Sequence, residues 1–106
     1  QHPVAPALAY IDRHMGESIT NADLAEQCHL SEDHFIKVFR ESVGQTPGRY
    51  VLERRIAEAG QLLTFTHDSI EQIAESVGFA NRFHFSRAFA KRMGFGPATY
   101  RKNNRV

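Results

Sequence analysis

Cysteine and proline are scarce in this sequence, tryptophan is absent, and no long hydrophobic run occurs in it. A single cysteine excludes an internal disulfide and is typical of a reducing compartment. No apolar stretch approaches the roughly 18 residues that a membrane-spanning helix needs, and the N-terminus carries no signal-peptide pattern. We therefore expect a cytoplasmic protein without a membrane partner.

Catalytic and metal-binding patterns are missing as well. The sequence contains neither a nucleophile–base arrangement nor a glycine-rich phosphate loop. Its most compact group of possible metal ligands is Cys28, His29 and His34, but two histidines five positions apart do not share a helical face. We expect ordinary surface or core histidines, and no enzymatic activity, metal or cofactor.

Apolar residues make up 42% of the 106 positions, which is enough for one small domain with a modest core. Eight phenylalanines indicate that this core consists of aromatic rings together with leucine and isoleucine side chains. The chain begins with glutamine and not with methionine, so we expect it to be a piece of a longer protein.

The formal net charge of +1 hides an uneven distribution along the chain. Residues 1–78 carry all twelve acidic groups and six basic ones, whereas residues 79–106 carry seven basic groups and no acidic group. Such asymmetry indicates a polyanionic partner. The alternative is a solvated basic tail, but four of the seven cations lie among the phenylalanines of segment 82–92, which favours a folded surface.

The sequence contains one segment twice. Leu24-Ala25-Glu26 matches Ile73-Ala74-Glu75 at an offset of 49, and five further positions match at an offset of 50. Identities at a nearly constant spacing predict a duplicated structural element. The five further pairs are Phe35 and Phe85, Phe39 and Phe89, Gly44 and Gly94, Pro47 and Pro97, and Tyr50 and Tyr100.

Each copy predicts a short helix, a three-residue turn and a longer helix, which is the helix-turn-helix arrangement. The turns are residues 28–30 and 77–79, and Gly78 suits a left-handed backbone conformation there. His29 occupies the equivalent position of the first copy, where the left-handed conformation is tolerated but is less favourable than for glycine. The predicted N-caps are Thr20 and Ser31 in the first copy and Ser69 and Asn81 in the second.

A long helix joins the two copies. Pro47 suits the first helical position, and an apolar stripe runs for about seventeen residues behind it. With a first helix over residues 4–15 and a short last helix after Pro97, we expect an all-α fold of about seven helices. We expect one domain with two helix-turn-helix subdomains, residues 1–45 and 65–106, on either side of a linker helix over residues 46–64.

Together these residues resemble the tandem helix-turn-helix DNA-binding domain of AraC/XylS-type bacterial transcription regulators. The resemblance implies seven helices, two subdomains joined by the long middle helix, and one recognition helix in each. It also implies transcription regulation, activation included, with a sensor domain upstream and RNA polymerase as further partners of duplex DNA. The residues that carry it are Gly78-Phe79, Phe85-Ser86-Arg87-Ala88-Phe89, Gly94, Pro97 and Tyr100-Arg101, and, on the long helix, Pro47, Tyr50, Arg55, Ala59, Leu62 and Leu63.

The candidate base contacts of the first copy lie opposite its two phenylalanines. Ile36 is apolar on a face predicted to point away from the core, which suits a thymine methyl group. Asp33 can accept a hydrogen bond from a cytosine amino group, and Lys37 can donate to guanine. Arg40 completes the group. The alternative is an ordinary solvated face, because acidic and basic side chains oppose one another on it.

The candidates of the second copy are more cationic. Arg82 and Arg87 can bind guanine edges or phosphates, and Ser86 can bond to either. Phe83 packs either on a thymine methyl group or in the protein core. Four further residues are candidates for contacts to the DNA backbone, two through their side chains and two at helix N-termini. They are Lys91 and Arg101, and Thr20 and Ser69.

Two such helices are expected to enter successive major grooves, about 34 Å apart. Residues 31–44 sum to a charge of −1 and residues 81–94 to +4, so we expect the second copy to supply most of the electrostatic affinity and the first to discriminate between sequences. The acidic first copy leaves an alternative open, namely a helical protein-interaction module whose contact with DNA is reduced or lost.

Overall fold

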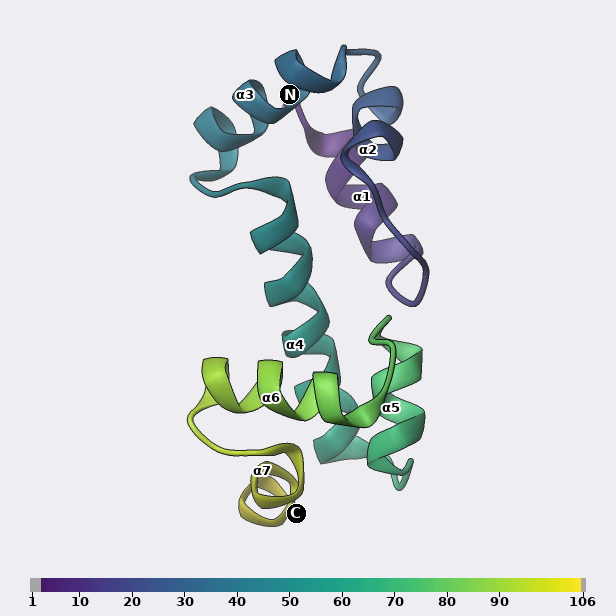
Figure 1. Cartoon of the computed structure of the whole chain (residues 1–106), viewed down its shortest axis with the longest axis vertical. Helices are drawn as coiled ribbons and strands as arrows, with labels where there is room; N and C mark the ends of the chain where they lie inside the picture. Colours follow the sequence, from purple (N-terminus) through teal and green to yellow (C-terminus); the bar gives the residue numbers. More distant parts are fainter. Residues whose placement is uncertain (1–2, 106) are drawn as a thin grey trace. The chain divides into compact units, whose positions relative to one another are not determined.

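The computed structural model describes residues 3–105, and over this range it consists of seven α-helices without strands (Figure 1). The predicted all-α fold of seven helices is confirmed. The helices are α1 (Ala5–Arg13), α2 (Asn21–Gln27), α3 (Glu32–Val43), α4 (Pro47–Phe65), α5 (Ile70–Ser76), α6 (Arg82–Met93) and α7 (Pro97–Asn104). None of the helices in the described range is long and apolar enough to cross a membrane.

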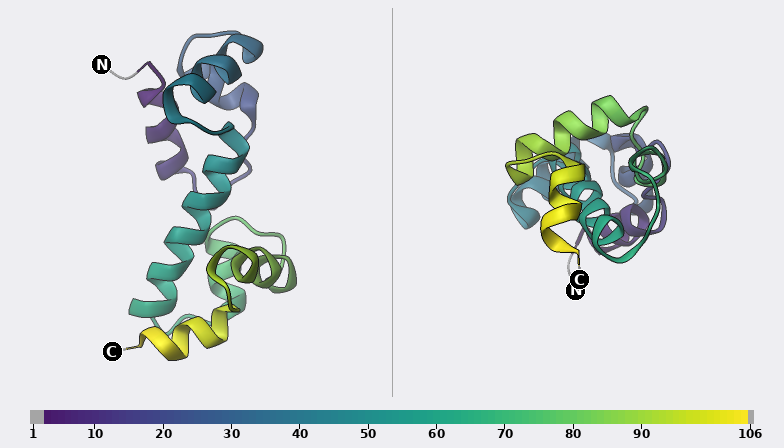
Figure 2. Two further views of the ribbon diagram at one scale, coloured as in Figure 1. Left: turned by 90° about the vertical axis from the view of Figure 1, so that its left-hand side faces the viewer. Right: turned by 90° about the horizontal axis from the view of Figure 1, so that it is seen from below.

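The chain divides into two compact units, Gln1–Glu53 and Arg54–Val106, here called the first and the second unit. The division falls within α4, which has 19 residues and is continuous in the views of Figure 2. Helix α4 corresponds to the linker helix expected over residues 46–64. Tyr50 and Val51 of α4 pack in the first unit, and Ile56, Ala59 and Leu63 are buried in the second.

The core of the first unit is built around two aromatic side chains of α3. Phe35 and Phe39 are fully buried, with ring centroids 5.5 Å apart. The ring of Tyr50 meets Phe39 edge-on at 5.7 Å, so the start of α4 is held against α3. Apolar side chains of the other helices complete this cluster, namely Val4, Ala7, Ile11, Leu24, Ala25 and Val51.

The second unit repeats this aromatic packing. Phe85 and Phe89 of α6 are fully buried with centroids 5.6 Å apart, and Tyr100 of α7 meets Phe89 edge-on at 5.1 Å. Both the residue pairs and their ring geometry are therefore duplicated, as the repeat predicted. The other buried apolar residues of this unit are Val77 together with Ile56, Ala59, Leu63, Ile73 and Ala74.

The second unit also contains a close approach between two helices. At Gly60 of α4, a Cβ atom would lie 3.3 Å from the hydroxyl oxygen of Tyr100. A side chain at residue 60 would therefore require the Tyr100 ring to shift, which favours glycine at this buried helical position.

Candidate nucleic-acid interface

The turns that precede α3 and α6 have the same hydrogen bonds. In the first unit, the N–H groups of His29 and Leu30 donate to the carbonyl oxygens of Glu26 and Ala25, at 3.1 and 3.0 Å. This pair of bonds around a left-handed residue is a Schellman motif. His29 has φ 58°, which confirms the left-handed conformation expected for it.

In the second unit, the N–H groups of Gly78 and Phe79 donate to the carbonyl oxygens of Glu75 and Ala74, at 3.1 and 2.9 Å. Here a side chain adds to the turn, because Nη1 of Arg55 donates to the carbonyl oxygen of Gly78 at 3.2 Å. Burial lowers the pKa of Arg55 from its usual value. A cation from α4 thus holds the turn that orients α6, a role that the sequence did not indicate.

Each long helix of the motif begins at a side-chain cap. The N–H group of His34 donates to Oγ of Ser31 at 3.3 Å, and that of His84 donates to Oδ1 of Asn81 at 2.9 Å. Both helices end at a left-handed glycine, Gly44 with φ 89° and Gly94 with φ 92°. These predicted boundaries define the α3 and α6 segments that can face a partner.

The outer surface of α3 carries charges of both signs. Asp33, Lys37 and Arg40 are exposed, as expected for a contact surface. Ile36 is not, because it is partly buried and packs against the core of the first unit. The expectation that Ile36 faces away from the core is wrong. It follows Phe35 by one helical step of about 100°, which puts it on the flank of the buried stripe and not opposite to it.

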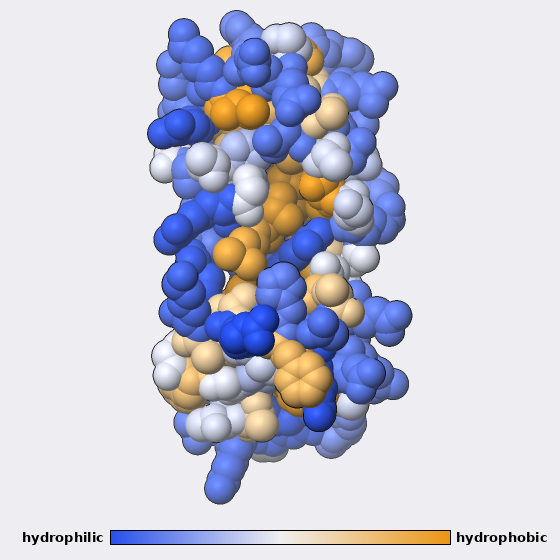
Figure 3. All heavy atoms as spheres, viewed as in Figure 1, coloured by the Kyte–Doolittle hydropathy of each residue, from blue (hydrophilic) through white to orange (hydrophobic). Residues whose placement is uncertain are grey.

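The outer surface of α6 is cationic and contains one aromatic ring. Phe83 is 64% exposed, so it is not a core residue. The guanidinium group of Arg82 lies over its ring, 5.0 Å from the centroid. Arg87 and Lys91 are exposed, and Ser86 is half-buried. The view in Figure 3 shows polar side chains over most of the surface, with apolar groups exposed in places.

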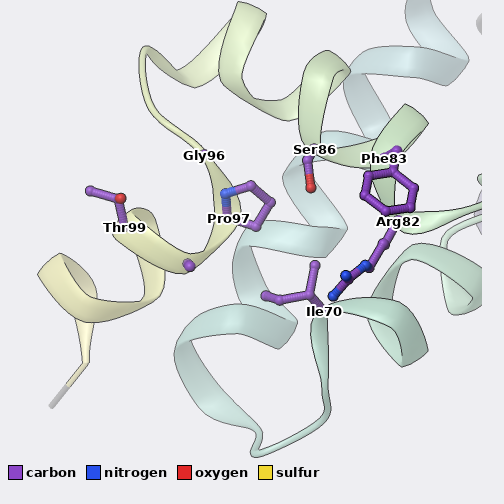
Figure 4. Close-up of a pocket in the computed structure, with 8 residues that line it drawn as sticks. Ile70, Arg82, Phe83, Ser86, Gly96, Pro97 and Thr99 are labelled. Atoms are coloured by element: carbon purple, nitrogen blue, oxygen red, sulfur yellow. The ribbon is translucent and has the colours of Figure 1, made fainter.

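A pocket of about 290 Å³ lies beside the first two turns of α6 (Figure 4). Three of the four base-contact candidates of this helix line it, together with residues at the start of α5 and of α7. No acidic side chain takes part. The lining residues are Arg82, Phe83 and Ser86 with Ile70, Gly96, Pro97, Ala98 and Thr99.

The two helix N-termini suggested for phosphate contacts differ in the side chain that completes the capping box. Thr20 forms a capping box with Asp23, whose Oδ2 accepts from the Thr20 N–H group at 3.1 Å. Ser69 forms the same motif with the neutral side chain of Gln72, at 2.8 Å. A carboxylate also lies in the first turn of α5, namely Glu71, so neither helix start is free of negative charge that repels a phosphate.

Arg101 takes part in the fold. Its guanidinium group donates to the carbonyl oxygens of Leu63, at 3.0 Å, and Thr66, at 3.3 Å. Arg105 binds the same two oxygens at 3.0 and 2.8 Å, and also contacts Nδ1 of His67. The two arginines cap the C-terminal end of α4, where positive charge is favourable. Arg105 is the residue after the last turn of α7, four positions beyond Arg101, and this spacing was the only sign of the shared role in the sequence.

No group of three or more histidine, cysteine or carboxylate side chains in the described range could hold a metal ion. The chemistry available at α3 and α6 is hydrogen bonding and charge, from guanidinium, ammonium, hydroxyl and carboxylate groups.

Known proteins share this arrangement. A family model described as a helix-turn-helix domain matches residues 24–103. The MmsAB operon regulatory protein of Pseudomonas aeruginosa is 34% identical over 97 residues, which are 92% of this chain and 32% of that protein. The chain spans about a third of the length of the curated relatives it matches.

Two solved structures are similar over nearly the whole chain. One is an AraC-type transcriptional regulator from Chromobacterium violaceum, with a TM-score of 0.90 and 27% identity over 96% of this chain and 91% of that one. The other is the DNA-binding domain of AdpA in complex with a target DNA. It has a TM-score of 0.90 and 26% identity over 97% of this chain and 93% of that one.

Proposed function

The chain is a helix-turn-helix DNA-binding domain of the AraC/XylS family of transcription regulators, and we propose that it places α3 and α6 in two successive major grooves of duplex DNA. Members of this family bind DNA to regulate transcription and are not enzymes. An α-helix fits the major groove of B-DNA, where its outward side chains reach base edges.

The observation that carries this proposal is the cationic, exposed surface of α6. Arg87 and Lys91 are exposed on it, and no acidic residue occurs between Phe79 and Val106. In the first unit, α3 offers Lys37 and Arg40 beside acidic groups. Since both helices follow a Schellman turn of the same geometry, each unit supports the same mode of docking.

We propose that α3 and α6 have different roles in DNA binding. Cations that neutralise phosphates supply affinity for any sequence, and α6 with Arg87 and Lys91 is the better placed for this. The backbone N–H groups at the start of α5, next to Ser69, are proposed as a further phosphate contact. On α3, Asp33, Lys37 and Arg40 combine donors and acceptors, which suits discrimination between base pairs. Ile36 is partly buried against the core, so we propose only a secondary contact with bases for this side chain.

Hydroxyl-radical footprinting of a duplex selected from a random pool tests this proposal. We expect two protected stretches on one face of the DNA, about one helical turn or 10 base pairs apart. Replacement of Lys37 and Arg40 by alanine should weaken one stretch, and replacement of Arg87 and Lys91 the other. A single protected stretch that disappears with either pair of substitutions would contradict docking in two grooves.

The rest of the regulator is proposed by analogy with the family. Because the chain spans about a third of its curated relatives, we propose that a sensor domain lies upstream and controls this one. We also propose that the regulator contacts RNA polymerase in the bacterial cytoplasm and thereby activates transcription. Circular dichroism verifies that the isolated chain is folded. If the folded chain bound no duplex DNA at low salt, it would be a protein-interaction module and not a DNA-binding domain.

A further inference from the structure

Phe83 exposes more of its side chain than any other large apolar residue of α6. An aromatic ring that is 64% exposed lowers solubility and gains nothing from the core, so its place on the proposed DNA-facing helix suggests a contact outside the protein. The residues around the Phe83 ring indicate which chemical groups such a partner would have.

The ring has one covered face and one open side. The guanidinium group of Arg82 lies over it at 5.0 Å from the centroid, which is cation–π geometry. Phe83 and Ser86 also line the 290 Å³ pocket, with Ile70 and Pro97 as apolar neighbours (Figure 4). The site therefore combines an apolar wall with two hydroxyl groups, of which that of Ser86 is on α6 and that of Thr99 on α7.

The first unit has different residues at the positions equivalent to Phe83 and Ser86. At the offset of 50 residues, Phe83 corresponds to Asp33 and Ser86 to Ile36. Ile36 packs against the core of its unit, whereas Ser86 is too short to fill the equivalent volume. At these two positions α6 therefore carries a phenyl ring and a hydroxyl group, where α3 carries a carboxylate and an apolar side chain.

Duplex DNA offers few apolar groups to such a site. On the floor of the major groove, the 5-methyl group of thymine is the apolar one, and it lies next to the O4 acceptor of the same base. We infer that Phe83 and Ser86 read one thymine, with the 5-methyl group packed on the open side of the phenyl ring and the Ser86 hydroxyl donating to O4. This inference rests on the proposed docking of α6 in the major groove.

The test uses the 106-residue chain and duplexes that it selects from a random pool. Each thymine of the selected site is replaced in turn by deoxyuridine, which lacks only the 5-methyl group. We expect one position at which deoxyuridine weakens binding of the wild-type chain about fourfold, the value for removing one buried methyl group from an apolar contact. In F83A, the same replacement should have no effect.

Two further variants separate this contact from general effects. Ser86→Ile introduces the side chain of residue 36 and fills the hollow, so discrimination between thymine and deoxyuridine should also be lost. Phe65→Ala removes a ring that is 71% exposed at the end of α4, and this control should discriminate as the wild type does. Circular dichroism and thermal unfolding verify that each variant is folded.

Several outcomes would overturn the inference. If wild-type binding is unchanged by deoxyuridine at every position, no methyl group is read, even though DNA binding itself stands. If Phe83→Ala remains sensitive to deoxyuridine at the same position, another residue reads the methyl group. If the wild-type chain selects no duplex at all, both the inference and the proposed function fail.

Discussion

His29 adopts a left-handed backbone conformation, with φ 58°, at the position that Gly78 occupies with φ 93° in the second unit. Both residues lie in Schellman turns with matching hydrogen bonds, so the two turns have one geometry and two residue types. A side chain in this conformation costs about 1–2 kcal/mol relative to its usual conformation, whereas glycine avoids this cost. The first unit therefore has a strained turn before α3.

Replacement of His29 by glycine is expected to raise the free energy of unfolding by about 0.5–1 kcal/mol. Relief of the left-handed strain exceeds the greater entropy of glycine in the unfolded chain. Urea denaturation followed by circular dichroism measures the change. The reverse control, Gly78→Ala, should lower stability, because residue 78 is left-handed too. A decrease for His29→Gly would mean that the imidazole makes a stabilising contact.

Replacement of Arg101 by alanine is expected to destabilise the chain by about 1–3 kcal/mol, since the carbonyl oxygens of Leu63 and Thr66 each lose a charged donor. Lysine at residue 101 should not restore stability, because it cannot bond both oxygens from a planar fork. Thermal unfolding is the measurement. Lys102→Ala changes an exposed neighbour and serves as the control, with an expected effect within about 0.5 kcal/mol.

The salt dependence of DNA binding should separate Arg87 from Arg101. If Arg87 neutralises a phosphate, Arg87→Ala lowers the slope of log affinity against log salt by about 0.9. An Arg101→Ala variant that is still folded should keep the wild-type slope, because its guanidinium group serves the end of α4. Titrations between about 50 and 200 mM salt provide the measurement. An unchanged slope after loss of Arg82 and Arg87 together would argue against α6 as the main source of electrostatic affinity.

Replacement of Gly60 by leucine is expected to destabilise the second unit by about 1–3 kcal/mol, because a Cβ atom alone would lie 3.3 Å from the Tyr100 hydroxyl. Gly48→Ala is the control on the same helix. A Cβ atom at residue 48 has no neighbour within 4 Å, so alanine should be neutral or stabilise by up to about 1 kcal/mol. Chemical denaturation distinguishes the two cases. Equal stability of Gly60→Leu and the wild type would show that the Tyr100 side chain can move aside without cost.

The regular elements could be predicted because their signals are local. Capping boxes at Thr20 and Ser69, terminal glycines at residues 44 and 94, and Pro97 at a first helical position all act within one turn of chain. The repeated aromatic residues then indicated which faces are buried. For α6 this was enough to place Arg87 and Lys91 on the exposed surface.

The candidate site was harder to predict where several elements meet. Ile36 was expected to be exposed and is partly buried, because α3 buries the flank as well as the centre of its apolar stripe. Phe83 could not be assigned to core or surface from the sequence, since periodicity alone does not show how far the neighbouring helices extend over α6.

By itself, the sequence determined the seven helices, their caps, the duplicated turn and the sign of the charge on α6, because each depends on residues a few positions apart. Only the tertiary structure decided the use of particular cations and rings. Arg55 and Arg101 bind carbonyl oxygens 23 and 38 residues away, and Ser86 leaves a hollow only because α5 and α7 border it. Such contacts depend on how helices distant in the sequence pack together, and spacing along the chain does not contain that information.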